Sequence, residues 1–227
     1  MQNLNKRFFI PVFDELNLGE NEYCKKCNAC YKTPLLPWIV GADYEKSEYK
    51  LMIIGKPHRG EGKRVSNNAF FMDYCIDWLM GCRWPYWSYS RQIAQNLYDL
   101  EGMNKIVLTN VVKCSNTDGK DTTTREMMDA CIRKNGVIWR EISLLKPKNI
   151  LFYTYKLFPE YLKDIPFQVE LLGEKREFVK CGAKAMPWWE RLIMTEWGKV
   201  KFLVTCHPER MRKVEYIKLI TDWVKSC

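Results

Sequence analysis

Three cysteines stand close together near the start of the chain, at Cys24, Cys27 and Cys30. Two residues separate each neighbouring pair, and this spacing allows two thiolates to face one metal ion. The residues between the cysteines are mainly polar, which argues against a purely apolar role in a core. The spacing therefore indicates part of a metal site.

A second candidate group lies in Ile106–Cys114, whose sequence is IVLTNVVKC. Its first half is apolar and β-branched, which predicts a buried strand. Asn110 falls at the end of this strand, and its amide offers both a donor and an acceptor that could read the edge of a base or sugar. Cys114 follows four residues later and could anchor a metal group beside the site. Taken alone, the two residues are more often a turn cap and a small buried hydrophobe, so their assignment depends on the rest of the chain.

The chain has only two histidines, and each follows an apolar segment. His58 lies in the basic loop Gly55–Arg64, whose glycines permit close approach to a phosphate or a base. This loop lacks the GxxxxGK[ST] spacing of a phosphate-binding P-loop. His207 opens the basic segment His207–Lys213, and its simplest alternative role is in a turn, because His-Pro is a common turn dipeptide. The placement of both histidines in such loops favours a ligand site.

These loops need elements that bring them together. Four apolar segments have the character of buried strands, and stretches with helical character lie between and after them. One such stretch, 124–145, begins with a possible capping box of Thr123 and Glu126. The expected strands are Tyr49–Gly55, 105–112, Lys148–Thr154 and Lys201–Cys206, and helices are expected near 71–80, within 83–104, and at 124–145, 155–163 and 209–225.

This alternation predicts a single α/β domain with a central four-stranded, mainly parallel sheet flanked by helices. Residues 1–23 form an N-terminal lead-in, and residues 24–227 form the domain. In an open parallel sheet, ligands bind outside the carboxyl ends of the strands. We therefore expect the loops Gly55–Arg64, Asn110–Cys114 and His207–Lys213 to converge.

The composition bounds the kind of partner. The 227-residue chain is 47% hydrophobic and carries 36 basic against 27 acidic residues, a net charge of +9. This excess is compatible with a polyanionic partner, of which nucleic acid is the first candidate. No apolar run reaches the ~18 residues of a membrane span and no signal-peptide pattern is present, so we expect a cytoplasmic protein with no membrane partner. Cytosolic cysteines rarely form structural disulfides, which leaves metal binding open for the 10 cysteines.

The order of these motifs resembles that of the family 4 uracil-DNA glycosylases, which carry an iron–sulfur cluster. The family pattern has an early C-x2-C, a strand ending in a GE-x-PG loop, a downstream Phe, then N-V-V-K-C, a second Cys on a helix, and a final H-P with a later Arg. Asn110–Cys114 matches the central motif literally, and Cys131 follows after 16 intervening residues. VTCHPERMR, which contains His207, matches the last motif. The resemblance spans about residues 24–225.

The resemblance implies a uracil-DNA glycosylase-like fold with a structural [4Fe–4S] cluster held by four cysteines. Two of these are Cys114 and Cys131. The other two are either Cys27 and Cys30, which the distance to the next strand favours, or Cys24 and Cys27. Thiolate spacing alone does not select the metal, so a zinc site or free thiols stay open.

The implied reaction is cleavage of the N-glycosidic bond of a base flipped out of DNA. Asn110 would bond the base edge, and Phe70 or Phe71 would stack on the base. His207 would donate a hydrogen bond to the anion that develops on the departing base. Attack at C1′ needs a positioned water, for which Glu61 and backbone groups are the candidates. Basic side chains would contact phosphates or fill the gap left by the flipped nucleotide: Arg64, Arg210, Arg212 and Lys213.

One loop departs from the family pattern and forms much of the uracil pocket in that family. A lysine replaces the acidic residue of GE-x-PG, and a bulky residue replaces the second glycine. The target therefore stays open between uracil and a modified pyrimidine, such as the glucosylated hydroxymethylcytosine of phage DNA. The substrate-binding candidates in this loop are Gly55, Lys56, Pro57, His58 and Arg59.

We therefore expect a monomeric, monofunctional DNA glycosylase that leaves an abasic site in single- or double-stranded DNA. Its role would be base-excision repair or antiviral defence. The main alternative is a non-catalytic iron–sulfur protein that binds DNA and senses a base. A weaker alternative is a zinc protein without a nucleic-acid function.

Overall fold

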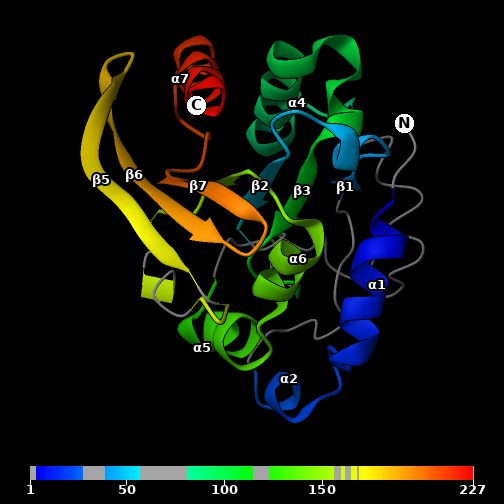
Figure 1. Ribbon diagram of the computed structural model, residues 1–227. Coiled ribbons are helices and arrows are strands. Elements are labelled where there is room, and N and C mark those ends of the chain that lie inside the picture. The colour runs from blue at the N-terminus through cyan, green and yellow to red at the C-terminus, as the bar shows by residue number, and fades with distance from the viewer. Residues whose placement is uncertain are drawn as a thin grey trace.

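A computed structural model describes residues 4–27, 39–56, 81–114, 123–155, 160–161, 165–167 and 169–226. Over these ranges the chain forms one α/β domain around a seven-stranded mixed sheet with the order β1-β3-β2-β4-β7-β6-β5 (Figure 1). The strands are β1 (Ile39–Val40), β2 (Leu51–Gly55), β3 (Val107–Asn110), β4 (Asn149–Phe152), β5 (Glu170–Cys181), β6 (Lys184–Thr195) and β7 (Gly198–Thr205).

The centre of the sheet consists of β3, β2, β4 and β7, which run parallel to one another. These are the four strands predicted from the apolar runs, and that part of the prediction is confirmed. Side chains along β2 alternate between two cores, with Ile53 in one and Ile54 in the other. Because both faces of the parallel strands are covered, each contains consecutive apolar residues, such as Leu51–Ile54 in β2 and Ile150–Phe152 in β4.

The predicted total of four strands is wrong, because the described residues contain three further, antiparallel strands. β1 pairs with β3 at one edge, and β6 pairs with β7 and β5 with β6 at the other. In β5, the residues before Cys181 are exposed or only half-buried, so the strand lacks the apolar pattern of a buried one. The one local signal is Gly182, whose φ of 61° suits the tight turn between β5 and β6.

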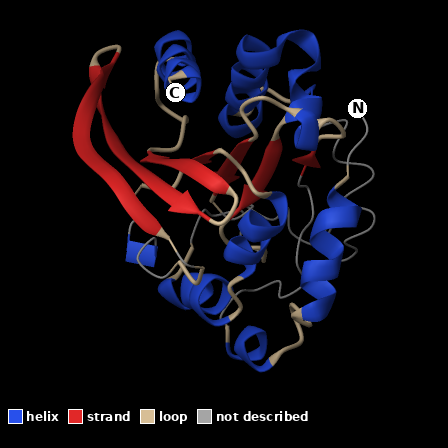
Figure 2. Cartoon of the chain, viewed as in Figure 1, coloured by secondary structure: helices blue, strands red, loops and turns tan. Residues whose placement is uncertain are grey.

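Six α-helices flank the sheet in the described part of the chain (Figure 2). α1 and α6 contact each other and contribute to the core on one face, whereas α4 and α7 pack together on the other. The bounds are α1 (Asn5–Glu15), α2 (Glu22–Lys26), α4 (Pro85–Tyr98), α5 (Arg125–Met128), α6 (Val137–Leu145) and α7 (Lys213–Lys225), with 3-10 turns at Tyr44–Lys46 and Asp99–Lys105.

The stretch predicted as one helix over 124–145 is divided into three parts. α5 is followed by a π-helical turn, Asp129–Lys134, and α6 begins after Gly136, whose φ of 62° is left-handed. The hydroxyl that caps α5 belongs to Thr124 rather than to the predicted Thr123. The break arises because Gly136 adopts a conformation that a continuous helix does not contain.

The remaining helix predictions have mixed outcomes. The C-terminal helix is confirmed, although it begins at Lys213 rather than near residue 209. α4 supplies the helix expected within 83–104. The helix expected at 71–80 lies outside the described residues, as does most of the one at 155–163. No helix in the described ranges is both long and apolar enough to span a membrane.

Candidate functional site

Asn110 is the last residue of β3 and lies at the carboxyl edge of the sheet, beside Gly55 at the end of β2. Its side chain is buried, with 5% of the residue exposed. A Cβ atom at Gly55 would lie 2.5 Å from the Asn110 Oδ1 and 2.5 Å from a ring carbon of Tyr86. Glycine is therefore required at position 55, because it leaves the space that the Asn110 amide and the Tyr86 ring occupy.

Tyr86 and Tyr153 form an aromatic wall between Asn110 and His207. The Tyr86 hydroxyl donates to the Thr109 carbonyl at 2.9 Å, and its ring meets Tyr153 edge to face at 5.9 Å. Burial raises the pKa of both phenols well above the ordinary value, so both stay neutral. Sequence reasoning missed this wall. Its only signal was the aromatic-rich segment at the start of α4.

His207 follows β7 by two residues and contacts the far side of this wall. Its ring lies edge-on to Tyr153, with 6.2 Å between centroids. The Glu209 backbone N–H donates to the His207 Nδ1 at 3.2 Å. When the imidazole is neutral, its proton is therefore on Nε2, which makes Nε2 the hydrogen-bond donor. The side chain is 23% exposed, so it can reach a ligand without being fully hydrated.

Two tyrosines hold the backbone on either side of His207. The Tyr216 hydroxyl, from α7, donates to the Cys206 carbonyl at 2.9 Å. The Tyr89 hydroxyl, from α4, donates to the Met211 carbonyl at 2.8 Å. The loop that carries His207 is thus tied to both helices on this face of the sheet.

The basic residues after His207 are exposed: Arg210 and Arg212 lie on the same loop, and Lys213 begins α7. Arg210 has a left-handed φ of 76°, and its carbonyl accepts from the Lys184 Nζ at the hairpin tip at 2.5 Å. Arg212 pairs with Glu215 at 3.0 Å, and the Lys213 ammonium lies over the Tyr89 ring at 5.7 Å.

Several predicted site residues fall outside the described ranges, and only Gly55 and Lys56 of the first loop lie within them. Lys56 is half-buried directly after β2. The residues outside are Pro57, His58, Arg59, Glu61, Arg64, Phe70 and Phe71, together with Cys30 of the cysteine group.

Four cysteines from three separate segments meet in one core. Cys24 lies in α2 and Cys27 directly follows it, Cys114 follows β3, and Cys131 lies in the π-helical turn. All four are buried members of the same cluster, and an amide N–H of Asn135 donates to the Cys24 Sγ at 3.7 Å. The tertiary structure therefore gathers thiols that are more than 100 residues apart in sequence.

These cysteines are of the residue type that binds a thiolate metal group, but Cys131 is not ionised and the four are not arranged around a common centre. Burial raises the pKa of Cys131 to about 12, and the nearby Cys27 and Cys24 raise it further, so without a cation this thiol keeps its proton. Among the described residues, no three His, Cys, Asp or Glu side chains are placed to hold a metal ion as they lie. Binding would thus require the thiols to deprotonate and turn toward a common centre.

A buried ion pair joins the Asn110 end of β3 to the segment that carries Cys114. The Lys113 Nζ lies 2.7 Å from the Glu141 Oε2 on α6, and both side chains are fully buried. Lys113 also donates to the Asn110 carbonyl at 2.6 Å and to the Thr109 hydroxyl at 2.7 Å. Burial lowers the pKa of Lys113 and raises that of Glu141, and each partner opposes the shift in the other.

Comparison with known proteins adds no assignment to this geometry. Models of known protein families do not match the chain, and no curated protein matches it. The resemblance carried by the motifs therefore stays a prediction, and the function has to be argued from the arrangement of the site.

The Gly55 contacts generate one prediction. Gly55→Ala should lower the free energy of unfolding by about 1–3 kcal/mol, because the new methyl group overlaps Asn110 and Tyr86. The matched control is Gly173→Ala in β5, where a Cβ meets nothing within 4 Å. Urea unfolding of both variants measures the difference. Equal stability of the two would contradict the packing described for Gly55.

The buried pair generates a second prediction. Lys113→Met and Glu141→Leu should each lower the free energy of unfolding by about 3–5 kcal/mol, because each leaves an uncompensated buried charge. The double variant should lower it by less than either single change. Lys218→Met, which breaks an exposed pair with Asp222, is the matched control and should change stability by less than about 1 kcal/mol. A double-mutant cycle by denaturant unfolding tests this, and strictly additive losses would show that the pair is not coupled.

Proposed function

We propose that the protein is a DNA glycosylase that hydrolyses the N-glycosidic bond of a flipped-out pyrimidine and leaves an abasic site. The observation that carries the proposal is the arrangement at the carboxyl edge of the sheet. A buried amide, Asn110, and an imidazole donor, His207, lie at the two ends of one aromatic wall. A planar base lying against this wall would meet the Asn110 amide at one end and the His207 hydrogen-bond donor at the other.

Asn110 suits the recognition of a base edge. Its amide can donate and accept at the same time, as the edge of a pyrimidine requires. Because the residue is buried, a base that failed to complete these hydrogen bonds would leave the amide unsatisfied, which costs binding free energy. The contact with Gly55 keeps the amide in place at the end of β3.

His207 suits the stabilisation of the leaving group. Hydrolysis breaks the bond between C1′ and the base nitrogen, and the electron pair leaves with the base. The water oxygen adds to C1′ and loses one proton, which the departing base finally takes up. Negative charge develops on the base before it gains this proton, and an Nε2–H directed at a base oxygen would stabilise that charge. A single preorganised donor of this kind contributes about 100- to 1,000-fold to the rate. Glu61 remains the candidate for positioning the water, and it lies outside the described residues.

The charge distribution suits DNA as the substrate. The chain carries a net charge of +9, and the exposed basic residues Arg210, Arg212 and Lys213 follow His207 directly. Such residues would bind phosphates and set the register of the strand. The altered loop after Gly55 leaves two targets, uracil in base-excision repair or an enlarged pyrimidine such as a glucosylated hydroxymethylcytosine in defence against phage. We expect the enzyme to act in the cytoplasm as a monomer.

A [4Fe–4S] cluster is the metal group that we propose for the buried cysteines. Cys114 and Cys131 would supply two ligands, and two of Cys24, Cys27 and Cys30 would supply the others. The cluster would act as a structural brace rather than in the reaction. It would tie α2 and the π-helical turn to the segment directly after Asn110.

The catalytic proposal predicts base release. Purified protein should create alkali-labile sites in oligonucleotides that carry uracil, hydroxymethylcytosine or its glucosylated form, and His207→Ala should slow release about 100- to 1,000-fold without loss of DNA binding. Val214→Ala, an exposed change on α7, is the control and should leave the rate unchanged. Release by His207→Ala at the wild-type rate would refute the role of His207. DNA binding by the wild type without release from any substrate would favour the base-sensing alternative.

The cluster predicts metal content. Protein purified without oxygen should contain about four iron and four sulfide per chain and absorb broadly near ~400 nm. Cys114→Ser and Cys131→Ser should lose most of the iron, whereas Cys181→Ser, a buried cysteine of the other core, should keep it. Comparison of Cys24→Ser with Cys30→Ser identifies the second pair of ligands. Zinc in place of iron, or equal iron in all variants, would exclude the cluster.

A further inference from the structure

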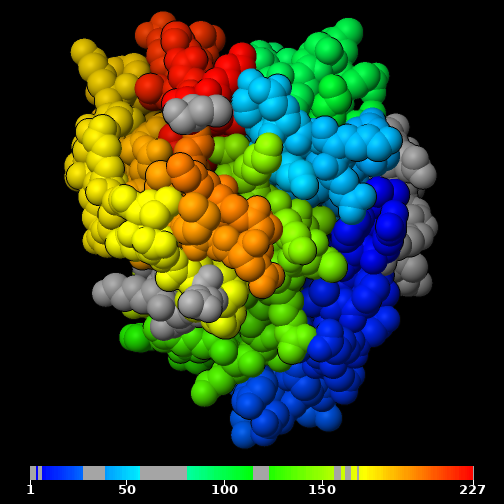
Figure 3. Space-filling model, viewed as in Figure 1, coloured from blue at the N-terminus to red at the C-terminus, as the bar shows by residue number. Residues whose placement is uncertain are grey.

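The β5–β6 hairpin carries a hollow of about 190 Å³ that the candidate site does not include. Pockets that enclose a whole small-molecule ligand usually measure about 300–1,000 Å³, so this one fits a single planar ring system. In the space-filling view the yellow and orange hairpin covers the flank of the molecule opposite the blue α1 (Figure 3). Six residues line the hollow: Tyr155, Arg176, Glu177, Phe178, Trp188 and Trp189.

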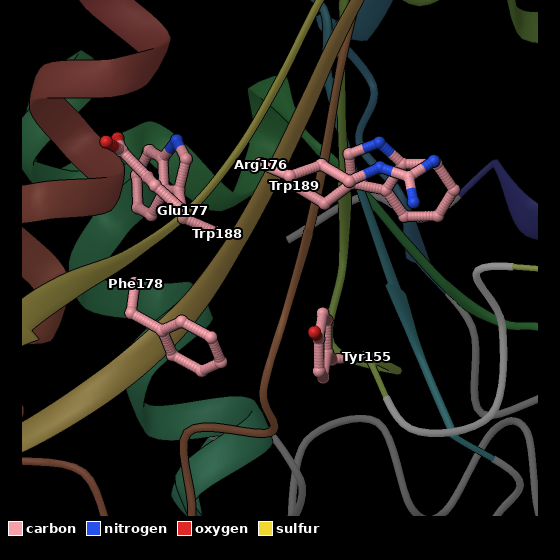
Figure 4. A pocket seen from close by; sticks show the side chains of 6 residues that line it. All are labelled: Tyr155, Arg176, Glu177, Phe178, Trp188 and Trp189. Atoms are coloured by element: carbon pink, nitrogen blue, oxygen red, sulfur yellow. The ribbon is translucent and has the colours of Figure 1, made fainter.

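A stacked cation forms one side of the hollow. The Arg176 guanidinium lies 4.1 Å from the centre of the Trp189 ring (Figure 4). Glu174 holds it in place, because its carboxylate pairs with Arg176 at 2.7 Å and with Arg191 at 3.2 Å. Trp189 is buried whereas the Arg176 side chain is 60% exposed. The hairpin therefore presents the planar Arg176 guanidinium to solvent, held against the buried Trp189 ring.

Two further rings complete the hollow. Phe178 is 69% exposed and lies below Glu177 and Trp188 in Figure 4, whereas Tyr155 lies below the Arg176–Trp189 stack. Glu177 pairs with Lys175 at 2.7 Å, so its charge is compensated. The exposed Phe178 ring beside a stacked arginine is a surface on which an unpaired base can stack, because every base has a π-face and the arginine adds a cation–π contact.

The hollow lies at the same edge of the sheet as the candidate site. Trp188 pairs in register with Thr205 of β7, and His207 follows Thr205 by two residues. Tyr155 lies three residues beyond the end of β4, and its backbone N–H donates to the Thr205 carbonyl at 3.1 Å. Neighbouring strands lie ~4.8 Å apart, so β6 and β5 bring the hollow to the same carboxyl edge as His207. Trp189 of the hollow packs in the core of α1 and α6, whereas Tyr153 beside His207 packs in the core of α4 and α7.

We propose that this hollow seats an unpaired base of the bound DNA strand, next to the nucleotide held between Asn110 and His207. The inference rests on the proposed function, since it assumes that a DNA strand crosses this edge. Stacking between Phe178 and the Arg176–Trp189 pair would accept any base. It would keep the strand from re-pairing beside the flipped nucleotide and would favour single-stranded or locally opened DNA.

A double-mutant cycle that combines protein substitutions with removal of single bases from the DNA tests the proposal, with the dissociation constant as the measured quantity. The probe is a short single-stranded oligonucleotide with a central tetrahydrofuran residue, which mimics the abasic product and cannot be cleaved. A second tetrahydrofuran replaces each flanking nucleotide in turn. For the wild type, removal of the base at one flanking position should weaken binding at least about 5-fold. For Phe178→Ala and Arg176→Gln, removal of that same base should have almost no further effect.

Matched controls come from the same strand, β5. Leu171→Ala removes an exposed apolar side chain and Lys180→Gln removes an exposed charge, and neither residue lines the hollow. Both controls should respond to base removal as the wild type does. If the wild type binds the probe but no flanking position couples to Phe178 or Arg176, the hollow is not a base site, and the proposed glycosylase function is unaffected. If the wild type binds no DNA, the proposed function itself fails.

Discussion

The buried ion pair between Lys113 and Glu141 is the interaction on which the rest of the site depends. It joins α6 to the end of β3 at a point where no solvent can screen either charge. The same ammonium holds the Asn110 carbonyl, so the pair sets where β3 ends and how the chain turns toward Cys114. A buried charge is stable only with such partners, so substitution of either Lys113 or Glu141 alone would destabilise this part of the fold. The proposed base reader and the proposed metal brace thus share one anchor.

The aromatic wall of Tyr86 and Tyr153 connects functional groups that lie at the ends of non-adjacent strands. Asn110 and His207 end strands separated in the sheet by β2 and β4. A wall of two neutral, buried phenols bridges that distance without introducing a charge beside the imidazole. It also keeps water away from one side of the site, which would strengthen a hydrogen bond from His207 to a developing anion.

The antiparallel hairpin lengthens the carboxyl edge of the sheet beyond its parallel strands. A sheet of four parallel strands would end at β7, and His207 would lie at its margin. β6 and β5 extend the sheet past this margin, and the hairpin tip reaches back to the His207 loop through Lys184 and the Arg210 carbonyl. The carboxyl edge becomes a longer surface with basic and aromatic groups along it. The proposed binding of a nucleic-acid strand here rests on this surface.

The sequence by itself determined the parallel core, the place of Asn110 at a strand end and the cysteines available to a metal. Uninterrupted apolar runs and C-x2-C spacing are local features, and both can be read without knowing the fold. The hairpin was not predictable in this way, since β5 is exposed and owes its conformation to cross-strand pairing with β6. The Lys113–Glu141 pair and the wall of Tyr86 and Tyr153 likewise join residues far apart in the chain. Only tertiary packing decided them, because a buried charge or phenol is placed by partners that no local pattern identifies.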